Sequence, residues 1–162
     1  MVAAATSPAA EPLVRRVGQA LETVMDPEIP VLSIVELGIV RHVRLREDGL
    51  VHVGLTPTYS GCPATELIHR SVREALLGQG LAAVVLETVL WPAWSSEWMS
   101  EQGRQKLEAY GIAVERAPAG RIACPRCASR AVERLSEFGS TPCKAHYRCS
   151  ACLEPFDTFK CI

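Results

Sequence analysis

Residues 50–77 read LVHVGLTPTYSGCPATELIHRSVREALL, and the period of the apolar residues changes inside this stretch. Residues 50–57 alternate between apolar and polar side chains, which predicts a β-strand. Residues 63–77 carry their apolar side chains at helical spacing, and Pro63 suits the first position of a helix. Between the two lies the turn YSGCP, residues 59–63, with one cysteine far from the other six in the chain. The stretch therefore predicts a strand, a turn that presents Cys62, and a helix.

The segments on either side follow the same reading. Apolar residues at helical spacing end at MDPEIP, where prolines 27 and 30 impose extended or turn geometry. The turn EDG, at 47–49, predicts a hairpin between two strands. Gly111 is a helix C-terminal signal. The expected helices span residues 13–25, 63–77 and 96–110, and the expected strands span residues 39–45, 50–57 and 82–91.

This order predicts an α+β fold with a small mixed sheet of three strands. The first two strands form an antiparallel hairpin, the third reaches the sheet through a helical crossover, and helices cover one face. We expect a disordered arm at 1–11, an α/β domain at 12–117 and a cysteine-rich tail at 118–162. The segment 112–120 is interpreted as a linker.

The tail contains two CxxC pairs, CPRC at 124–127 and CSAC at 149–152, separated by 21 residues. Each pair can direct two sulfurs at one ion, and two pairs complete a tetrahedron, which is the pattern of a zinc ribbon. We expect structural zinc on Cys124, Cys127, Cys149 and Cys152. The tail is poor in apolar residues, so the metal should supply most of its folding free energy.

Two further thiols, Cys143 and Cys161, leave two readings open. They pack in or beside the ribbon, or they form a second thiol pair for a labile metal or an iron–sulfur cluster. His146 could substitute as a ligand, although a lone histidine among Lys144, Tyr147 and Arg148 is more often a surface residue.

The isolated Cys62 is predicted at the N-cap of the helix that follows, where open backbone N–H groups stabilise a thiolate. Gly61 gives the turn the backbone freedom to project the thiol. Serine or aspartate would be the better cap, so cysteine at this position favours metal or nucleophile chemistry. If the MDPEIP loop folds against this turn, Asp26, Glu28 and Cys62 form an open site for transiently held iron. Asp26 could equally cap the turn ahead of Pro27.

Composition narrows the possible functions. The chain has 162 residues, of which 48% are hydrophobic and 22% are charged, and the apolar runs are too short to span a bilayer. The first residues have no basic segment and no sustained apolar segment, so we expect no signal peptide and a reducing cytoplasm. Residues 1–120 hold 10 basic against 14 acidic side chains, and residues 121–162 hold 7 against 4. This balance argues against a dedicated nucleic-acid binder.

The sequence shows no glycine-rich phosphate loop and no evident nucleophile–base–acid set. A single ExxH pair, Glu66 with His69, stands alone, whereas a di-iron bundle site needs two such pairs. His42 and His52 are interpreted as surface or strand residues. We therefore expect no self-sufficient catalyst.

Three motifs occur in the order found in a known family: DPEIPVLSIVELGIVRHV (26–43), TPTYSGCPA (56–64) and VLWPAWSSEWMSEQGRQKL (89–107). Together they resemble the iron–sulfur cluster assembly domain family. The tail from residue 136 onward is similar to one branch, PaaD or PaaJ, which is encoded with the phenylacetyl-CoA ring 1,2-epoxidase of phenylacetate breakdown.

The resemblance implies a maturation role centred on Cys62, with Asp26 and Glu28 at the positions of the family's loop. It also implies that a di-iron oxygenase subunit and a flavin/iron–sulfur reductase subunit carry the chemistry, as partners of this chain. A true subunit of the epoxidase is the alternative function, and a zinc-ribbon adaptor for nucleic acid is a weaker one. The sequence leaves a homodimer open.

Overall fold

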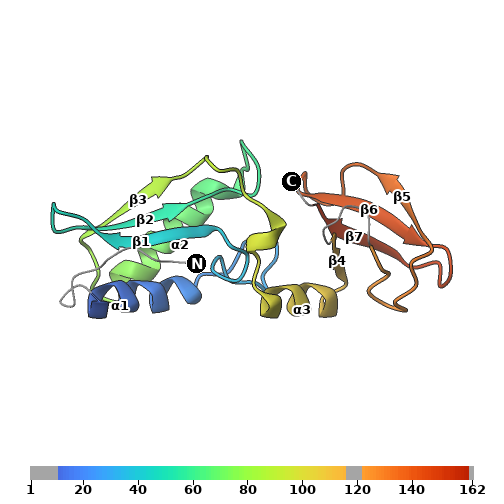
Figure 1. Cartoon of the computed structure of the whole chain (residues 1–162), viewed down its shortest axis with the longest axis horizontal. Coiled ribbons are helices and arrows are strands. Elements are labelled where there is room, and N and C mark those ends of the chain that lie inside the picture. The colour runs from blue at the N-terminus through green and yellow to red at the C-terminus, as the bar shows by residue number, and fades with distance from the viewer. Residues whose placement is uncertain (1–10, 116–121, 161–162) are drawn as a thin grey trace. The chain divides into compact units, whose positions relative to one another are not determined.

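The protein is described by a computed structural model that covers residues 11–115 and 122–160. The chain divides into two compact units, the first ending at Trp94 and the second beginning at Ser95 (Figure 1). The predicted boundary between residues 117 and 118 lies outside the described residues, as do Cys161 and the predicted arm apart from Glu11. Among the described residues, no helix has the length and apolarity needed to cross a lipid bilayer.

The first unit contains a three-stranded sheet and two helices, as the sequence predicts. Strand β2 is central, pairing antiparallel with β1 and parallel with β3, so the sheet order is β1-β2-β3. The crossover from β2 to β3 runs through α2. The elements are α1 (Glu11–Glu22), β1 (Val40–Leu45), β2 (Val51–Leu55), α2 (Ala64–Gly78) and β3 (Val84–Thr88).

The core of this unit forms around β2, in which all five residues are buried. Helix α1 contacts both α2 and β1. The two helices bury the apolar positions that gave them helical spacing, among them Val17 and Leu21 of α1 and Val72 of α2. The amphipathic pattern in the sequence therefore marks the surfaces that exclude water.

The segment between α1 and β1 is irregular but tightly packed. Backbone N–H groups of Asp26 and Ile34 donate to the carbonyls of Leu32 and Val24, at 2.8 and 2.9 Å. The indole N–H of Trp94 donates to the carbonyl of Leu37 at 3.0 Å. Two of the prolines in this chain end α1, and the fixed loop that follows places Asp26.

The second unit contains a 3₁₀ turn, one helix and a four-stranded sheet of order β4-β7-β6-β5. Strand β6 pairs antiparallel with β5 and β7, and β4 pairs parallel with β7. The elements are η1 (Ser96–Trp98), α3 (Glu101–Ala109), β4 (Ile112–Val114), β5 (Val132–Ser136), β6 (Lys144–Cys149) and β7 (Pro155–Phe159).

Two predictions are corrected here. The helix expected at 96–110 is divided, because the Ser100 hydroxyl oxygen accepts from the N–H of Gly103 at 2.9 Å and starts α3 there. The first part of the predicted linker 112–120 is wrong, since Ile112–Val114 is a strand whose three residues are all buried. Three residues are too few for a periodic pattern, so only the pairing with β7 reveals this strand.

Candidate functional site

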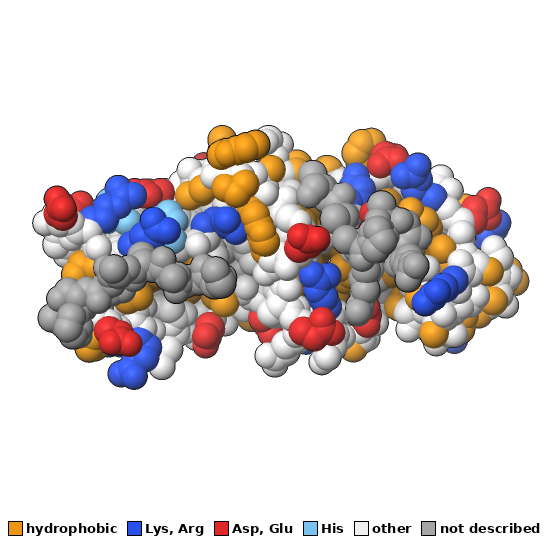
Figure 2. All heavy atoms as spheres, in the orientation of Figure 1, with side chains coloured by type: hydrophobic (Ala, Val, Ile, Leu, Met, Phe, Trp, Pro, Cys, Tyr) orange, Lys and Arg blue, Asp and Glu red, His pale blue; other side chains and the backbone are white. Residues whose placement is uncertain are grey.

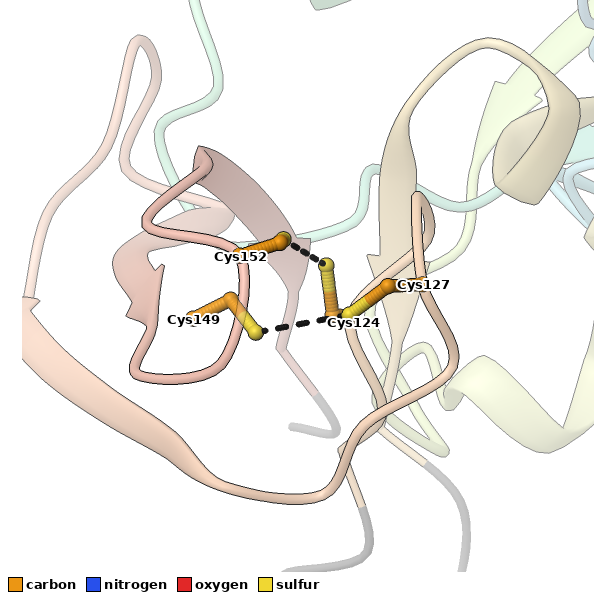
Figure 3. A group of neighbouring side chains, drawn as sticks. All are labelled: Cys124, Cys127, Cys149 and Cys152. Carbon is orange, nitrogen blue, oxygen red and sulfur yellow. Dashed lines mark hydrogen bonds between the residues drawn. The ribbon is translucent and has the colours of Figure 1, made fainter.

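The two CxxC pairs of the second unit meet at one point. Cys124 and Cys127 lie on one turn, Cys149 and Cys152 on another, and their sulfur atoms all lie within 4.8 Å of one another. The Sγ atoms of Cys124 and Cys152 are 3.7 Å apart, and those of Cys127 and Cys149 are 3.6 Å apart (Figure 3). Within the described part of the chain, this is the one cluster of three or more such side chains with metal-binding spacing.

The spacing fits a tetrahedral ion. Four sulfurs bound about 2.3 Å from one centre stand roughly 3.8 Å apart in a regular tetrahedron. The two measured separations lie within 0.2 Å or so of that value, which is within the usual tolerance for a metal site. Cys124 and Cys149 are buried, whereas Cys127 and Cys152 are exposed. The cluster is therefore a metal site with one protected side and one side open to solvent.

Backbone geometry explains why each pair can hold an ion. In both turns the N–H of the residue after the second cysteine donates to the carbonyl of the first, from Ala128 to Cys124 and from Leu153 to Cys149, both at 2.9 Å. Ala128 and Leu153 reach this position with φ of 59° and 64°, the left-handed region that side chains disfavour. Two turns of the same kind therefore close around the sulfurs.

The thiols differ in their protonation. Backbone N–H groups of Cys152 and Ala151 lower the pKa of Cys149 to about 6. The N–H of Glu154 acts in the same sense on Cys152, but burial and the neighbouring thiols outweigh it and raise the pKa of Cys152 to about 12. Four thiolates at this spacing repel one another, so their joint ionisation requires a cation among them.

The remaining candidate ligands of this unit lie elsewhere. Cys143 is buried, its Sγ is 3.0 Å from the Thr141 hydroxyl oxygen, and it is not part of the cluster. The Nδ1 of His146 lies 3.0 Å from Asp157 Oδ1, which makes His146 a partner of that carboxylate. The packing alternative for Cys143 agrees with this geometry, while Cys161 lies outside the described residues.

The isolated Cys62 lies in a hydrogen-bonded turn that leads into α2. Its N–H donates to the carbonyl of Tyr59, its carbonyl accepts from the N–H of Thr65, and Gly61 has a φ of 82°. The N-cap is Pro63, so Cys62 lies one residue earlier than predicted, and no side chain makes a capping hydrogen bond. A proline already in helical geometry shifts the cap forward. The thiol is partly exposed, as expected for a presented side chain.

Asp26 takes the capping role that the sequence left open. Its Oδ1 accepts from the N–H groups of Glu28 and Ile29, at 2.9 and 2.8 Å, and the residue is buried. Asp26, Glu28 and Cys62 do not come within metal-binding distance as a group of three. The hydrogen bonds show a carboxylate that shapes the MDPEIP loop.

Topology nevertheless brings the relevant loops to one end of the sheet. Val40, which opens β1, pairs with Leu55, which closes β2, and Leu55 pairs with Thr88, which closes β3. The loop before β1, the Cys62 turn after β2 and the loop after β3 therefore leave the sheet at the same end (Figure 1). The N–H of Val89 donates to the carbonyl of Leu55 at 2.8 Å, which ties the last two together.

Sequence reasoning missed a polar network on the opposite face of β2 from Val51, Val53 and Leu55. His52 is buried, with Nδ1 2.7 Å from Glu87 Oε1 and Nε2 3.0 Å from Asp48 Oδ2. Arg46 contacts the other Glu87 oxygen at 3.0 Å. The His42 ring lies directly over Gly54, where any side chain would collide with it. The alternation of β1 and β2 held the signal, since it puts both histidines on one face.

Comparison with known sequences assigns each unit. Residues 15–87 match the model of the iron–sulfur cluster assembly protein family, and residues 112–160 match that of the PaaD zinc beta ribbon domain. In structure, the chain is similar to a domain of unknown function from Bacillus anthracis, with a TM-score of 0.55 and 30% identity. That similarity covers 60% of this chain and 92% of the other.

Two curated relatives show how far each similarity extends. An Escherichia coli protein whose name assigns it to 1,2-phenylacetyl-CoA epoxidase, as one of the candidate subunits, is 48% identical over 94% of this chain and 96% of its own. The Fe-S protein maturation auxiliary factor YitW of Bacillus subtilis is 37% identical, over 60% of this chain and 95% of its own. The chain therefore belongs to the iron–sulfur cluster assembly protein family, in the branch that carries the PaaD zinc ribbon.

Proposed function

We propose that this chain is an accessory protein of phenylacetyl-CoA 1,2-epoxidase that assists assembly of an iron or iron–sulfur centre in partner subunits. The observation that carries the proposal is the similarity over 94% of the chain to the Escherichia coli relative, which spans both units. The maturation factors, which share only the first unit, support the assembly role. The partners we propose are the di-iron oxygenase subunit and the flavin/iron–sulfur reductase subunit, in the cytoplasm.

Within the proposal, Cys62 is the functional thiol. It is partly exposed in a turn fixed by two backbone hydrogen bonds, so it can meet a metal that another protein also holds. Asp26 keeps the neighbouring loop in shape through its two backbone hydrogen bonds. Glu28, whose N–H is one of those donors, lies in that loop as a further oxygen donor for transient iron.

The metal of the second unit is proposed to be zinc with a structural role. Four thiolates at tetrahedral spacing are the preferred ligand set for zinc, which has no redox chemistry of its own. The ribbon core is small, formed by Ala113, Ile122, Cys124, Cys149 and Phe156. A bound ion would therefore supply much of the folding free energy of this unit.

A Cys62→Ala variant tests the assembly role. Partner subunits produced with this variant should contain less iron and sulfide than those produced with the unaltered chain, and should be poorly active. Metal and acid-labile sulfide analysis of the purified partners measures this. Ser60→Ala is the matched control, because Ser60 is exposed in the same turn and carries no thiol. Equal iron and sulfide with Cys62→Ala and with the unaltered chain would contradict the proposal.

The second candidate is a stoichiometric subunit of the epoxidase, which the name of the Escherichia coli relative favours. An assembly factor acts before turnover, so its addition to fully assembled partners should change the rate little. A working subunit gives the opposite pattern, in which partners made without it carry full metal and activity rises in proportion to the protein added.

A further inference from the structure

Strand β3 is an open edge of the first unit's sheet. In the sheet order β1-β2-β3 it has β2 on one side only. The carbonyl of Ala83 and the N–H of Val89 both bond to β2. Because successive residues of a strand alternate in direction, the N–H and C=O groups of Val84, Leu86 and Thr88 point away from β2. Within the described part of the chain, no backbone hydrogen bond reaches these outward groups.

The two edges of the sheet are protected to different degrees. Strand β1 has an irregular register between Val40 and His42 and carries three arginines or fewer neutral gaps than β3, since its sequence is VRHVRL, and such charge discourages another strand from pairing. Strand β3, with the sequence VVLET, has a regular register and contains no proline, lysine or arginine. None of its residues is buried, although three of the five are apolar. The β3 edge is therefore the one that can accept a further strand.

Two apolar side chains are displayed directly beyond this edge. Leu90 is 61% exposed and Trp91 is 85% exposed, and Figure 2 shows hydrophobic side chains gathered on the surface near the end of β3. The loop that carries them is braced at both ends, by the hydrogen bond from Val89 to Leu55 and by the buried Trp94. Such exposure contributes nothing to the core, and tryptophan is the residue type most enriched at binding hot spots.

We propose that an extended segment of the client polypeptide adds to the sheet along β3 and places an apolar side chain on Leu90 and Trp91. This inference rests on the proposed function and names how the partner is held. The outward backbone groups require a strand as the occupant, because only an extended chain matches their donor and acceptor spacing.

The place of the edge selects the client as the partner. The loop that carries Trp91 is tied to the end of β2, and the Cys62 turn follows β2 closely in the sequence. A chain that runs along β3 toward Trp91 therefore arrives at the end of the sheet where Cys62 is presented. Docking at this edge would deliver a metal-binding segment of the client to the thiol.

Binding of the full-length chain to each purified epoxidase subunit, measured by calorimetry, tests the surface. Trp91→Ala should weaken binding to the client subunit by at least about tenfold, as expected for a hot-spot residue. Leu90→Ala should weaken it by a smaller factor. Leu77→Ala is the matched control, because Leu77 is 60% exposed on α2, away from the edge, and should leave the affinity unchanged.

Amide exchange at single-residue resolution tests the strand itself. On addition of the client subunit, the amides of Val84, Leu86 and Thr88 should exchange more slowly, while those of Val85 and Glu87, already bonded to β2, should not change. Unaltered affinity in Trp91→Ala together with unaltered exchange at β3 would overturn the proposal. Protection of β3 that depends on the concentration of this chain alone, or that is lost when residues 1–10 are deleted, would assign the edge to a second copy or to the chain's own start, and would also overturn it.

The two proposals can fail separately. Weakened binding in Trp91→Ala with full client metallation by Cys62→Ala would keep the docking surface and reject the assembly role. Reduced metallation by Cys62→Ala with unaltered binding in Trp91→Ala would do the reverse.

Discussion

His52 is held between two carboxylates, and this arrangement fixes its charge. Ionised Glu87 and Asp48 accept hydrogen bonds but donate none, so both ring nitrogens of His52 must carry a proton. The hydrogen bonds to Glu87 and then Asp48 raise the pKa of His52 above its usual value. The opposite holds for His42, whose pKa is lowered first by burial and then by Arg44, although its Nε2 is 3.6 Å from Glu87.

The raised pKa of His52 predicts a pH-dependent stability for the first unit. The contribution of His52 should be complete below the unfolded pKa of about 6.5 and should be lost as pH rises through the higher folded value. The difference in unfolding free energy between the unaltered chain and His52→Gln should therefore shrink as pH rises. Urea unfolding followed by amide signals of β2 measures it.

His69 provides a control of opposite sign. Burial lowers the pKa of His69, so its effect on stability is unfavourable below about pH 6.5. His69→Gln should consequently gain stability relative to the unaltered chain as pH falls. A difference for His52→Gln that stays constant between pH 6 and 9, or so, would show that His52 is not the titrating group.

At this scale the sequence predicted the four metal-binding cysteines and the presented thiol, because local spacing determines both. It could not decide between the two readings of Asp26, since a carboxylate before a proline suits a cap and a ligand equally. The hydrogen bonds to Glu28 and Ile29 decide for the cap. The pairing of His52 with Glu87 joins residues 35 positions apart, and depends on strand register that no local pattern contains.

Among the elements, the two metal-binding turns carry an unusual feature. Ala128 and Leu153 occupy the left-handed region, where glycine is the favoured residue. Leu153 is also 70% exposed, so its side chain adds little burial to compensate for the backbone conformation. The turn is held in this geometry by the hydrogen bond from its N–H to the carbonyl of Cys149.

Leu153→Gly should therefore stabilise the metal-loaded second unit by about 0.5–1 kcal/mol. Relief of a left-handed side chain is worth roughly 1–2 kcal/mol, and the larger unfolded-state entropy of glycine offsets part of it. Thermal unfolding of the metal-loaded protein measures the change. Leu153→Ala keeps the strain and should show no gain. A destabilised Leu153→Gly would mean that the exposed leucine makes a contact worth more than the strain.

The elements of the first unit followed from the sequence because each is long enough to show its period. Helix α2 was expected at 63–77 and spans Ala64–Gly78. The irregular alternation at Val40 and Arg41 corresponds to the irregular register of β1. Strand β4 was missed because only its distant pairing with β7 defines it, and the residues that precede it form a helix with no signal of the unit to which it belongs.

At the scale of the whole molecule, the sequence and the structure divide the chain differently. The sequence suggested that the helix near residue 100 belongs with the α/β domain, with a boundary at 117 and 118. In the structure the second unit begins at Ser95, α3 contacts β4, and β4 is a strand of the ribbon sheet. The metal site and α3 therefore share one compact unit.

This division makes a prediction about metal removal. Cys149→Ser takes away a buried ligand, and should unfold β4 to β7 because so small a core cannot hold the ribbon without its ion. Helix α3 should lose its amide protection with them, since it packs on β4. The amides of β2 and α2 should stay protected, because that core lies in the first unit. A chelator added to the unaltered chain should give the same pattern.

Amide exchange read residue by residue distinguishes the two divisions. If the amides of Glu101–Ala109 remain protected while those of β6 and β7 are lost, α3 folds with the first unit and the boundary near residue 117 is right. If β2 and α2 lose protection as well, the two units do not fold independently. Ser150→Ala is the matched control, because Ser150 lies in the same exposed turn between two ligands and its side chain is not one of them. We expect loss confined to the segment from Glu101 onward, with Ser150→Ala unchanged.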